Sequence, residues 1–387
     1  MKAPAPPSNK VVWIVGAGAS VSESRGHFPS LLGIPQKARD TGALSDDSDS
    51  ERGITQFAKY LKSRFYGDLK NPREVMNLEH VLTLLEIDIA VGGEPSLLLT
   101  RQYVLRLLRL TLLRLHKSMP EGEGQYKRLV DTLGPRDTII SFNWDYLLDE
   151  AFGRSHRLEG LGGTDHGGPQ YGKTHNRYDD FLLTHTGWGE RSISELGPPS
   201  PVHYLEDRGR YIKAHGSIDW YYCTNPGCRS HQTVFPLLGG SNRPKCSGCG
   251  ERTEVLIVPP TMNKRLRDVP LTRRLWTLAA AEMQHANEVA IWGYSLPPTD
   301  FFSDWLLRQA RSSRCKRLVL INPEVCLDGV SLNLPFIRRF VSALRAPGSP
   351  IALELYASFD AYEAGTSAAN TKAMKVQLRP LARGAER

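Results

Sequence analysis

Four of the six cysteines in this chain lie in two close pairs, Cys223 with Cys228 and Cys246 with Cys249. Two close pairs of thiolates separated by a loop can coordinate one zinc ion tetrahedrally, with all four positions filled and none left open for catalysis. In a reducing compartment such a cluster favours a metal over disulfides. The sequence therefore predicts a structural zinc site. Free thiols, or His231 in place of one cysteine, are the alternatives.

Small or polar residues follow nearly every predicted strand of the chain. These residues are Gly16, Ala17, Gly18, Ala19, Ser20, Asn143, Asp145, His215, Gly293, Ser295 and Asn322. Ligands of open parallel sheets bind at the carboxyl ends of the strands, so these residues should line one edge together. A dinucleotide is a ligand long enough to reach all of them.

Each of these positions also has an ordinary structural explanation when it is taken alone. The glycine turn has Val21 where the dinucleotide fingerprint has its third glycine, so a plain strand-to-helix turn stays open. His215 alone is more often a structural histidine. Asn143 can cap the next helix with Asp145 favouring its dipole, and Asn322 precedes a proline, as in a turn. Only the joint order of these residues points to a ligand.

The apolar pattern of the chain predicts an α/β fold. Short apolar strands are expected at residues 11–15, 137–143, 211–217, 254–260, 288–295 and 317–323. They alternate with amphipathic helical segments, and residues 54–119 are expected to be mostly helical, with Pro95 dividing them. This alternation predicts a Rossmann-like parallel sheet with helices on both faces.

The leucine-rich segment 97–115 does not have the character of a membrane span. Arg101, Arg106, Arg109 and Arg114 interrupt it, so no apolar run reaches the roughly 18 residues that a span needs. The N-terminus has no apolar core of the signal-peptide kind, and we expect a cytoplasmic protein. The segment is expected to pack within a helical layer, with a homo-oligomer interface as the alternative.

The net charge of +8 permits contact with nucleic acid. The basic residues are scattered, which favours a solvated basic surface over a dedicated nucleic-acid face. Residues 153–201 carry four histidines in a glycine-rich stretch without paired spacing. We expect a solvated loop there rather than a second metal site.

The joint order of these motifs resembles the sirtuin family, and more closely the divergent bacterial sirtuin-like proteins of antiviral defence. The resemblance runs from about residue 11 to 323, with 36–136 and 153–205 as insertions that match no motif. The motifs, in order, are Gly16–Ser20, Gly33-Ile34-Pro35, Phe142-Asn143-Trp144-Asp145, His215-Gly216, the four cysteines, Gly293-Tyr294-Ser295 and Ile321-Asn322.

The resemblance implies cleavage of the bond between nicotinamide and ribose in NAD. It implies that Gly16 to Ser20 hold the pyrophosphate. Asn143 and Asp145 would lie beneath the nicotinamide ribose, where Asn143 positions the attacking water. His215 would contact the ribose hydroxyls as general base or orienting group. The same resemblance adds Pro35 and Gly293 to the NAD-binding set and places Ser295 and Asn322 beside the adenosine half.

Two departures from deacylating sirtuins favour water as the acceptor. Gln36-Lys37-Ala38 stands where those enzymes have Asp-Phe-Arg, and Pro259-Pro260-Thr261-Met262 replaces the Phe-Gly-Glu stretch that lines their peptide groove. We therefore expect an NAD hydrolase, an anti-phage effector controlled by a partner or by oligomerisation. By resemblance, that partner is a ring-shaped DNA-translocating ATPase. A protein deacylase, or an inactive subunit that binds NAD or ADP-ribose and DNA, is the alternative.

We expect four parts in the chain. Residues 10–53, 135–220 and 253–345 would form a Rossmann-like NAD-binding domain. Residues 54–134 would be a helical insertion, residues 221–252 a zinc-ribbon module, and residues 346–387 a partly flexible C-terminal segment.

Overall fold

A computed structural model describes most of the chain outside the long central insertion. The described residues are 9–43, 51–65, 78–120, 122–134, 136–154, 211–231, 234–236, 244–259, 270–298, 300–311, 314–326, 331–344 and 351–366. The histidine-rich loop expected within 153–201 and the tail after residue 366 lie almost wholly outside the described residues, and so does the stretch 260–262.

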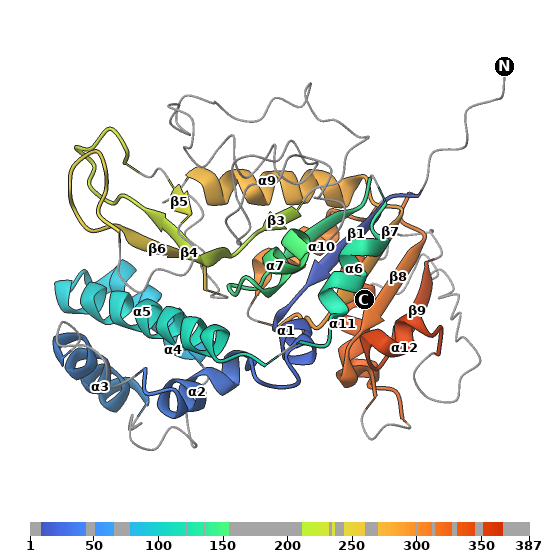
Figure 1. The fold of residues 1–387 in the computed structure, drawn as a ribbon, viewed down its shortest axis with the longest axis horizontal. Coiled ribbons are helices and arrows are strands. Elements are labelled where there is room, and N and C mark those ends of the chain that lie inside the picture. The colour runs from blue at the N-terminus through green and yellow to red at the C-terminus, as the bar shows by residue number, and fades with distance from the viewer. Residues whose placement is uncertain are drawn as a thin grey trace, which may run out of the picture.

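One sheet of the described chain has six strands, and every neighbouring pair in it is parallel (Figure 1). The strands are β1 (Val11–Val15), β2 (Thr138–Ser141), β3 (Tyr211–Lys213), β7 (Glu288–Trp292), β8 (Arg317–Ile321) and β9 (Ala352–Tyr356). They lie in the order β3-β2-β1-β7-β8-β9. The strands β1, β2 and β3 follow one another toward one edge of the sheet, and β7, β8 and β9 follow one another toward the other edge. This is the doubly wound Rossmann order. The predicted fold class is confirmed.

Aromatic side chains attach two helices to one face of this sheet. The ring of Trp13 in β1 lies 5.6 Å from that of Tyr362 in α12 (Phe359–Glu363). The ring of Trp292 in β7 lies 5.2 Å from that of Tyr126 in α6 (Gln125–Thr132). Trp13 pairs with Ala290 in β7, two residues before Trp292, so the two tryptophans point to the same side.

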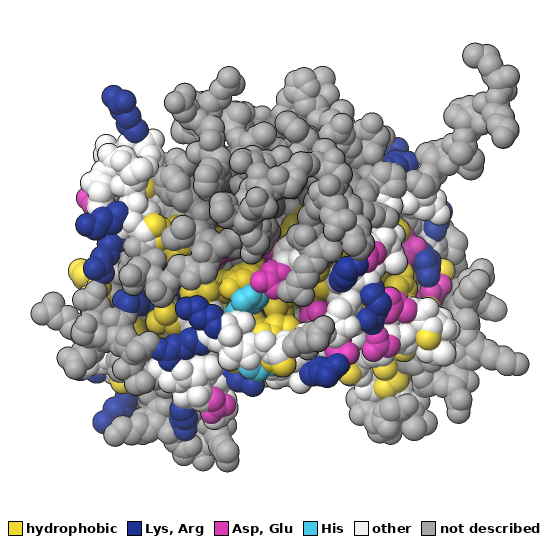
Figure 2. Space-filling model, viewed as in Figure 1, with side chains coloured by type: hydrophobic (Ala, Val, Ile, Leu, Met, Phe, Trp, Pro, Cys, Tyr) yellow, Lys and Arg dark blue, Asp and Glu magenta, His cyan; other side chains and the backbone are white. Residues whose placement is uncertain are grey.

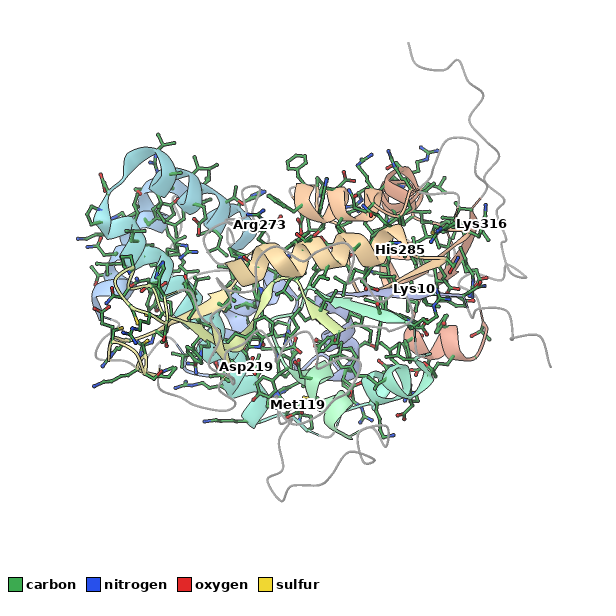
Figure 3. The ribbon with its side chains drawn as sticks, turned by 90° about the horizontal axis from the view of Figure 1, so that it is seen from above. Lys10, Met119, Asp219, Arg273, His285 and Lys316 are labelled. Carbon is green, nitrogen blue, oxygen red and sulfur yellow. The ribbon has the colours of Figure 1, made fainter. Side chains whose placement is uncertain are left out.

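A buried ion pair attaches α9 (Pro270–Gln284) to the opposite face. Lys10 Nζ lies 2.5 Å from Glu282 Oε2, and both side chains are fully buried. Thr138 at the start of β2 donates a hydrogen bond to the same carboxylate. Figure 3 looks onto α9 and shows Lys10 and His285 close together, where β1 begins and α9 ends. Helices therefore cover both faces, as the alternation predicted.

The strand expected at 254–260 does not belong to the parallel sheet, which corrects the sequence interpretation. Residues Glu254–Ile257 (β6) pair instead with β4 (Gly216–Tyr222) in a small antiparallel sheet that also holds β5 (Val234–Pro236). The strand expected at 211–217 is likewise divided, because Gly216 has a φ of +73° and turns the chain from β3 into β4. An apolar run does not reveal which strand it will pair with.

The C-terminal segment contributes a strand that the sequence interpretation does not include. Leu353 and Leu355 of β9 are buried, whereas Glu354 between them binds Arg317 of β8 at 2.7 Å. This half-polar alternation is typical of an edge strand, and it extends the sheet beyond residue 345. The division of the chain into four parts stays a prediction.

A layer of helices lies beside the small sheet (Figure 1). It contains η1 (Leu31–Gly33), α2 (Ile34–Asp40), α3 (Glu51–Phe65), α4 (Leu78–Gly92) and α5 (Pro95–Lys117). The leucines of α5 at 105, 108, 112 and 115 are buried, which confirms the packing interpretation of this helix. Arg109 is buried too, and its Nε donates to the Ile218 carbonyl of β4 at 3.1 Å.

The remaining helical elements are α1 (Ala17–Glu23), α7 (Leu147–Arg154), α10 (Phe301–Arg308), η5 (Pro323–Val325) and α11 (Leu334–Leu344). Within the described chain, no helix combines the length and the apolar character that crossing a bilayer requires.

Candidate functional site

The glycine turn after β1 packs against the backbone of the turn after β7. Gly16 N–H donates to the Trp292 carbonyl at 2.9 Å, and Gly18 N–H donates to the Gly293 carbonyl at 2.8 Å. A Cβ at Gly16 or Gly18 would lie 2.7 or 2.8 Å from that same Gly293 oxygen. Ala19 N–H is bonded to the Gly16 carbonyl. The two glycines are therefore required at least in part by close packing between these turns.

Gly293 is the other half of this contact, and it offers a test of the packing. It has a φ of +67°, and a Cβ there would overlap the Ala19 nitrogen. We expect Gly293→Ala to lower the free energy of unfolding by roughly 2–5 kcal/mol, from backbone strain together with overpacking. Chemical denaturation measures the change. Gly365→Ala is the control, because Gly365 has a φ of +65° with open space around it. Equal losses in both variants would show that the turn contact contributes nothing.

A buried network of hydrogen bonds joins the end of β1 to the loop after β2. Asn143 Nδ2 donates to the Gly16 carbonyl at 3.0 Å and to Ser20 Oγ at 2.9 Å. Ser20 Oγ donates to Asp145 Oδ2 at 2.8 Å. The hydroxyl of Tyr126 lies 2.9 Å from Ser20 Oγ and accepts from Asn143 Nδ2 at 3.2 Å. The structure thus brings three predicted site residues together and adds Tyr126.

The Asn143 amide has a defined orientation in this network. Its nitrogen faces the Gly16 carbonyl, which can only accept, so the oxygen must point the other way. Asn143 is 5% exposed, and its Oδ1 has no hydrogen-bond partner within the described chain. A buried acceptor without a partner is costly, and it is available to a ligand hydroxyl or a water.

Burial raises the pKa of the Asp145 carboxyl above its usual range, and the nearby charge of Lys213 partly offsets the shift. Lys213 Nζ donates to the Asp145 carbonyl at 2.7 Å and to Asp149 Oδ2 at 2.8 Å. Leu147 N–H donates to Asp145 Oδ1, so Asp145 also supports the start of α7. Asp145 therefore has the helix-start role that its sequence position suggested, and it also contacts Ser20.

His215 lies in the turn between β3 and β4 and is 3% exposed. Its ring stacks on that of Phe142, with centres 4.7 Å apart, and the Trp276 ring of α9 lies 5.8 Å away. Trp276 Nε1 donates to the Ala214 carbonyl at 2.9 Å, directly before His215. Phe142 directly precedes Asn143, so His215 packs on the same loop after β2 that carries the buried network.

The other predicted binding residues are spread over three elements. Asn322 caps η5 by accepting from Glu324 N–H, which is the turn role that the sequence left open, and its Nδ2 donates to the Tyr294 carbonyl at 3.4 Å. Ser295 follows Tyr294 and is half-buried. Pro35 lies in the first turn of α2, which packs against η1 and α5.

The sequence interpretation did not include two residues of the site. Tyr126 belongs to an amphipathic helix of the predicted insertion, and Lys213 stands in an apolar strand. A lysine inside an apolar strand is the one hint of a buried ion pair that the sequence offers.

Figure 2 shows hydrophobic side chains, with histidine among them, uncovered near the centre of one face. Acidic and basic side chains surround this area on both sides.

The four predicted zinc ligands come together next to the small sheet. Their sulfur atoms all lie within 4.8 Å of one another, with Cys223 Sγ 3.7 Å from Cys249 Sγ and Cys228 Sγ 3.6 Å from Cys246 Sγ. Zinc–sulfur bonds of about 2.3 Å in a tetrahedron require sulfur atoms roughly 3.8 Å apart. The backbone N–H groups of Ser230 and Gly248 donate to two of these sulfurs and favour their thiolate form. The cluster fits structural zinc.

We expect about one zinc per chain in freshly purified, unchelated protein, measured by metal analysis. Chelation should accelerate amide exchange in β4, β5, β6 and residues 244–253, because the bound metal supplies much of the folding free energy of such modules. The parallel sheet should keep its protection. Cys228→Ser should reproduce the effect of chelation, whereas Cys315→Ser, outside the cluster, should not. A zinc content near zero would contradict the assignment.

No family model matches this chain, and no curated protein matches it. Among solved structures it is similar to a Sir2 homologue in complex with NAD, at 13% identity over 87% of this chain and 86% of the other, with a TM-score of 0.37. A Sir2 homologue variant with 2′-O-acetyl ADP-ribose gives 13% identity, coverage of 87% and 93%, and a TM-score of 0.37. A sirtuin from a structural study of substrate affinity gives 14% identity, coverage of 92% and 94%, and a TM-score of 0.31. Similarity at this level decides neither fold nor function, so both rest on the strand order and the side chains above.

Proposed function

We propose that this protein hydrolyses NAD to nicotinamide and ADP-ribose. The observation that carries the proposal is the Asn143 amide, held at the carboxyl edge of a doubly wound sheet with a buried oxygen that has no partner within the described chain. His215 stacks on Phe142, the residue directly before Asn143. A buried acceptor beside an imidazole is suited to positioning a water and taking its proton.

The strand order supports a dinucleotide as the ligand. From β1 the chain adds strands toward one edge of the sheet, and from β7 it adds them toward the other. Ligands of such sheets bind in the crevice at the carboxyl ends of the two strands where this direction changes. In the proposal the pyrophosphate lies over the turn Gly16–Ser20. The N–H groups of Gly16, Gly18 and Ala19 are already bonded within the protein, so the exposed residue Ala17 would offer its N–H to the phosphate. Pro35, Gly293, Ser295 and Asn322 complete the proposed NAD-binding set.

The reaction breaks the bond between ribose C1′ and the nicotinamide nitrogen, and the electron pair of this bond leaves with nicotinamide. Positive charge develops on the ribose as the bond lengthens. Asn143 Oδ1 accepts a hydrogen bond from the water that attacks C1′, and His215 takes the proton that this water loses. Asp145, reached through Ser20, adds negative charge near the developing cation.

We further propose that activity depends on a partner or on assembly, as in an anti-phage effector. A ring-shaped DNA-translocating ATPase and a second copy of the chain are the proposed partners. Apolar side chains along one face of α4 support an assembly surface: Leu84, Ile87 and Val91 are 41%, 42% and 84% exposed.

A nicotinamide-release assay separates the proposed activity from its alternatives. The purified protein receives NAD alone, and then NAD with an acetylated peptide. Release with NAD alone supports the hydrolase, and release only with the peptide supports a deacylase. NAD or ADP-ribose binding without release in either arm, under every assembly state and with DNA present, supports an inactive binding subunit and contradicts the proposal.

A further inference from the structure

Tyr126 reaches the site from the helical segment that the sequence interpretation treats as an insertion. Its side chain is 1% exposed, and its ring packs edge-on against Trp292 of β7. The hydroxyl lies 2.9 Å from Ser20 Oγ and 3.2 Å from Asn143 Nδ2. It therefore contacts both Ser20 and Asn143.

The backbone around Tyr126 is bound to α1, the helix that carries Ser20. Glu23 at the end of α1 accepts from Tyr126 N–H at 3.0 Å and from Gly124 N–H at 3.1 Å. Its carbonyl also accepts from Glu123 N–H at 2.9 Å. The Glu23 side chain thus ties the backbone at Gly124 and Tyr126 to α1, and these bonds hold the Tyr126 hydroxyl beside Ser20.

Counting protons defines the direction of each hydrogen bond. The single Ser20 hydroxyl proton goes to the Asp145 carboxylate, so Ser20 Oγ can only accept from its other neighbours. The Tyr126 hydroxyl proton must then go to Ser20 Oγ. Its oxygen is left to accept from Asn143 Nδ2, whose two protons serve three acceptors, so one of these protons is shared between two of them. Tyr126 thus directs the Ser20 proton toward Asp145. It also helps to hold the Asn143 amide with its Oδ1 pointing away from the Gly16 carbonyl.

We propose that Tyr126 is a positioning residue of this site, which orients the Ser20 hydroxyl and the Asn143 amide without touching the substrate. The proposal rests on the proposed function. It assigns part of the active site to the helix α6, outside the segments whose motifs resemble a known family.

Tyr126→Phe removes the hydroxyl and keeps the ring packed on Trp292. We expect kcat for nicotinamide release to fall about 10- to 100-fold, because two buried groups lose a partner. KM for NAD should stay within about threefold, because no substrate contact is removed. The matched control is Tyr103→Phe, whose buried hydroxyl has no hydrogen-bond partner within the described chain. It should leave both constants unchanged.

A second readout is independent of activity. In protein labelled with ¹⁵N-asparagine, the Asn143 side-chain signal is assigned by its loss in Asn143→Ala. Hydrogen exchange of this amide should be at least about tenfold faster in Tyr126→Phe than in wild type or Tyr103→Phe. If Tyr126→Phe does not fold, Glu23→Gln removes one of the two acceptors that hold the Tyr126 and Gly124 N–H groups and leaves the acceptors of Asn143 Nδ2 in place, and it should show the same faster exchange.

The outcomes keep the two proposals apart. If the wild type releases nicotinamide, and Tyr126→Phe keeps both the wild-type kcat and the wild-type exchange rate of Asn143, the positioning role is wrong and the proposed function stands. An equal fall of kcat in Tyr103→Phe also overturns it, because the loss would then follow from general packing. Absence of release in the wild type contradicts the proposed function, whereas the exchange experiment still decides whether Tyr126 holds the amide.

Discussion

His215→Ala should lower the rate of nicotinamide release about 10²- to 10⁴-fold, the range expected for loss of a general base. The substitution removes the imidazole that stacks on Phe142, the residue before Asn143. Binding of NAD should stay within roughly tenfold of wild type, because the turn after β1 and the loop after β7 are untouched. Steady-state kinetics under activating conditions, together with calorimetric titration of NAD, measure the two effects separately.

A control histidine distinguishes catalysis from a general effect of losing an imidazole. His285 at the end of α9 bonds the Ala281 carbonyl on its own helix, outside the proposed site (Figure 3). His285→Ala should keep the wild-type rate. Wild-type rates in His215→Ala would show that the proposed base is wrong.

Asn143→Ala should abolish measurable nicotinamide release by the activated protein, with a loss of at least about 10²-fold. Two physical effects act together. The Asn143 Oδ1 that would position the attacking water is gone. The Gly16 carbonyl, Ser20 and Tyr126 also lose the Nδ2 donor that joins them. Affinity for NAD should again stay within roughly tenfold, because the pyrophosphate turn is unchanged.

Asn287→Ala is the matched control, since the side chain of Asn287 accepts from Lys10 N–H at the start of β1 and has a structural role there. It should cost stability, read from thermal unfolding, without changing kcat. If Asn143→Ala and His215→Ala each retain wild-type NAD hydrolysis under activating conditions, the active site lies elsewhere. Asp145→Asn is less informative, because Asp145 also accepts from Leu147 N–H at the start of α7.

Local pattern was sufficient for the strands β1, β2, β7 and β8, for the zinc ligands and for the edge at which Ser20, Asn143 and Asp145 meet. Four of the five apolar residues of β1 and the run in β7 are buried, as runs without alternation predict for a covered parallel sheet. Short spacing keeps the two cysteines of each pair close in the chain, and the pairing of β4 with β6 brings the two pairs to each other. Asn143, Asp145 and Ser20 met because the carboxyl ends of parallel strands share one edge.

Pairing partners were decided by the tertiary structure. The run 254–257 and the run 288–292 are both short and apolar, yet the first pairs antiparallel with β4 and the second parallel with β1. Nothing within either run records that choice, because strand pairing depends on residues far away along the chain. The edge strand β9 was missed for the same reason, since the partner of its Glu354, Arg317, lies on the neighbouring strand.

The roles of single residues also depended on distant neighbours. Sequence alone marked Gly16 and Gly18 as positions of close approach, and the structure shows the Gly293 turn as one partner in that approach. It marked Asn143 as polar at a strand end, but the direction of its amide is defined by the Gly16 carbonyl and by Tyr126, 127 and 17 residues away in the chain. Residue type and local period therefore determined which groups lie at the site. Contacts between distant segments decided which atoms of those groups are left to meet a ligand.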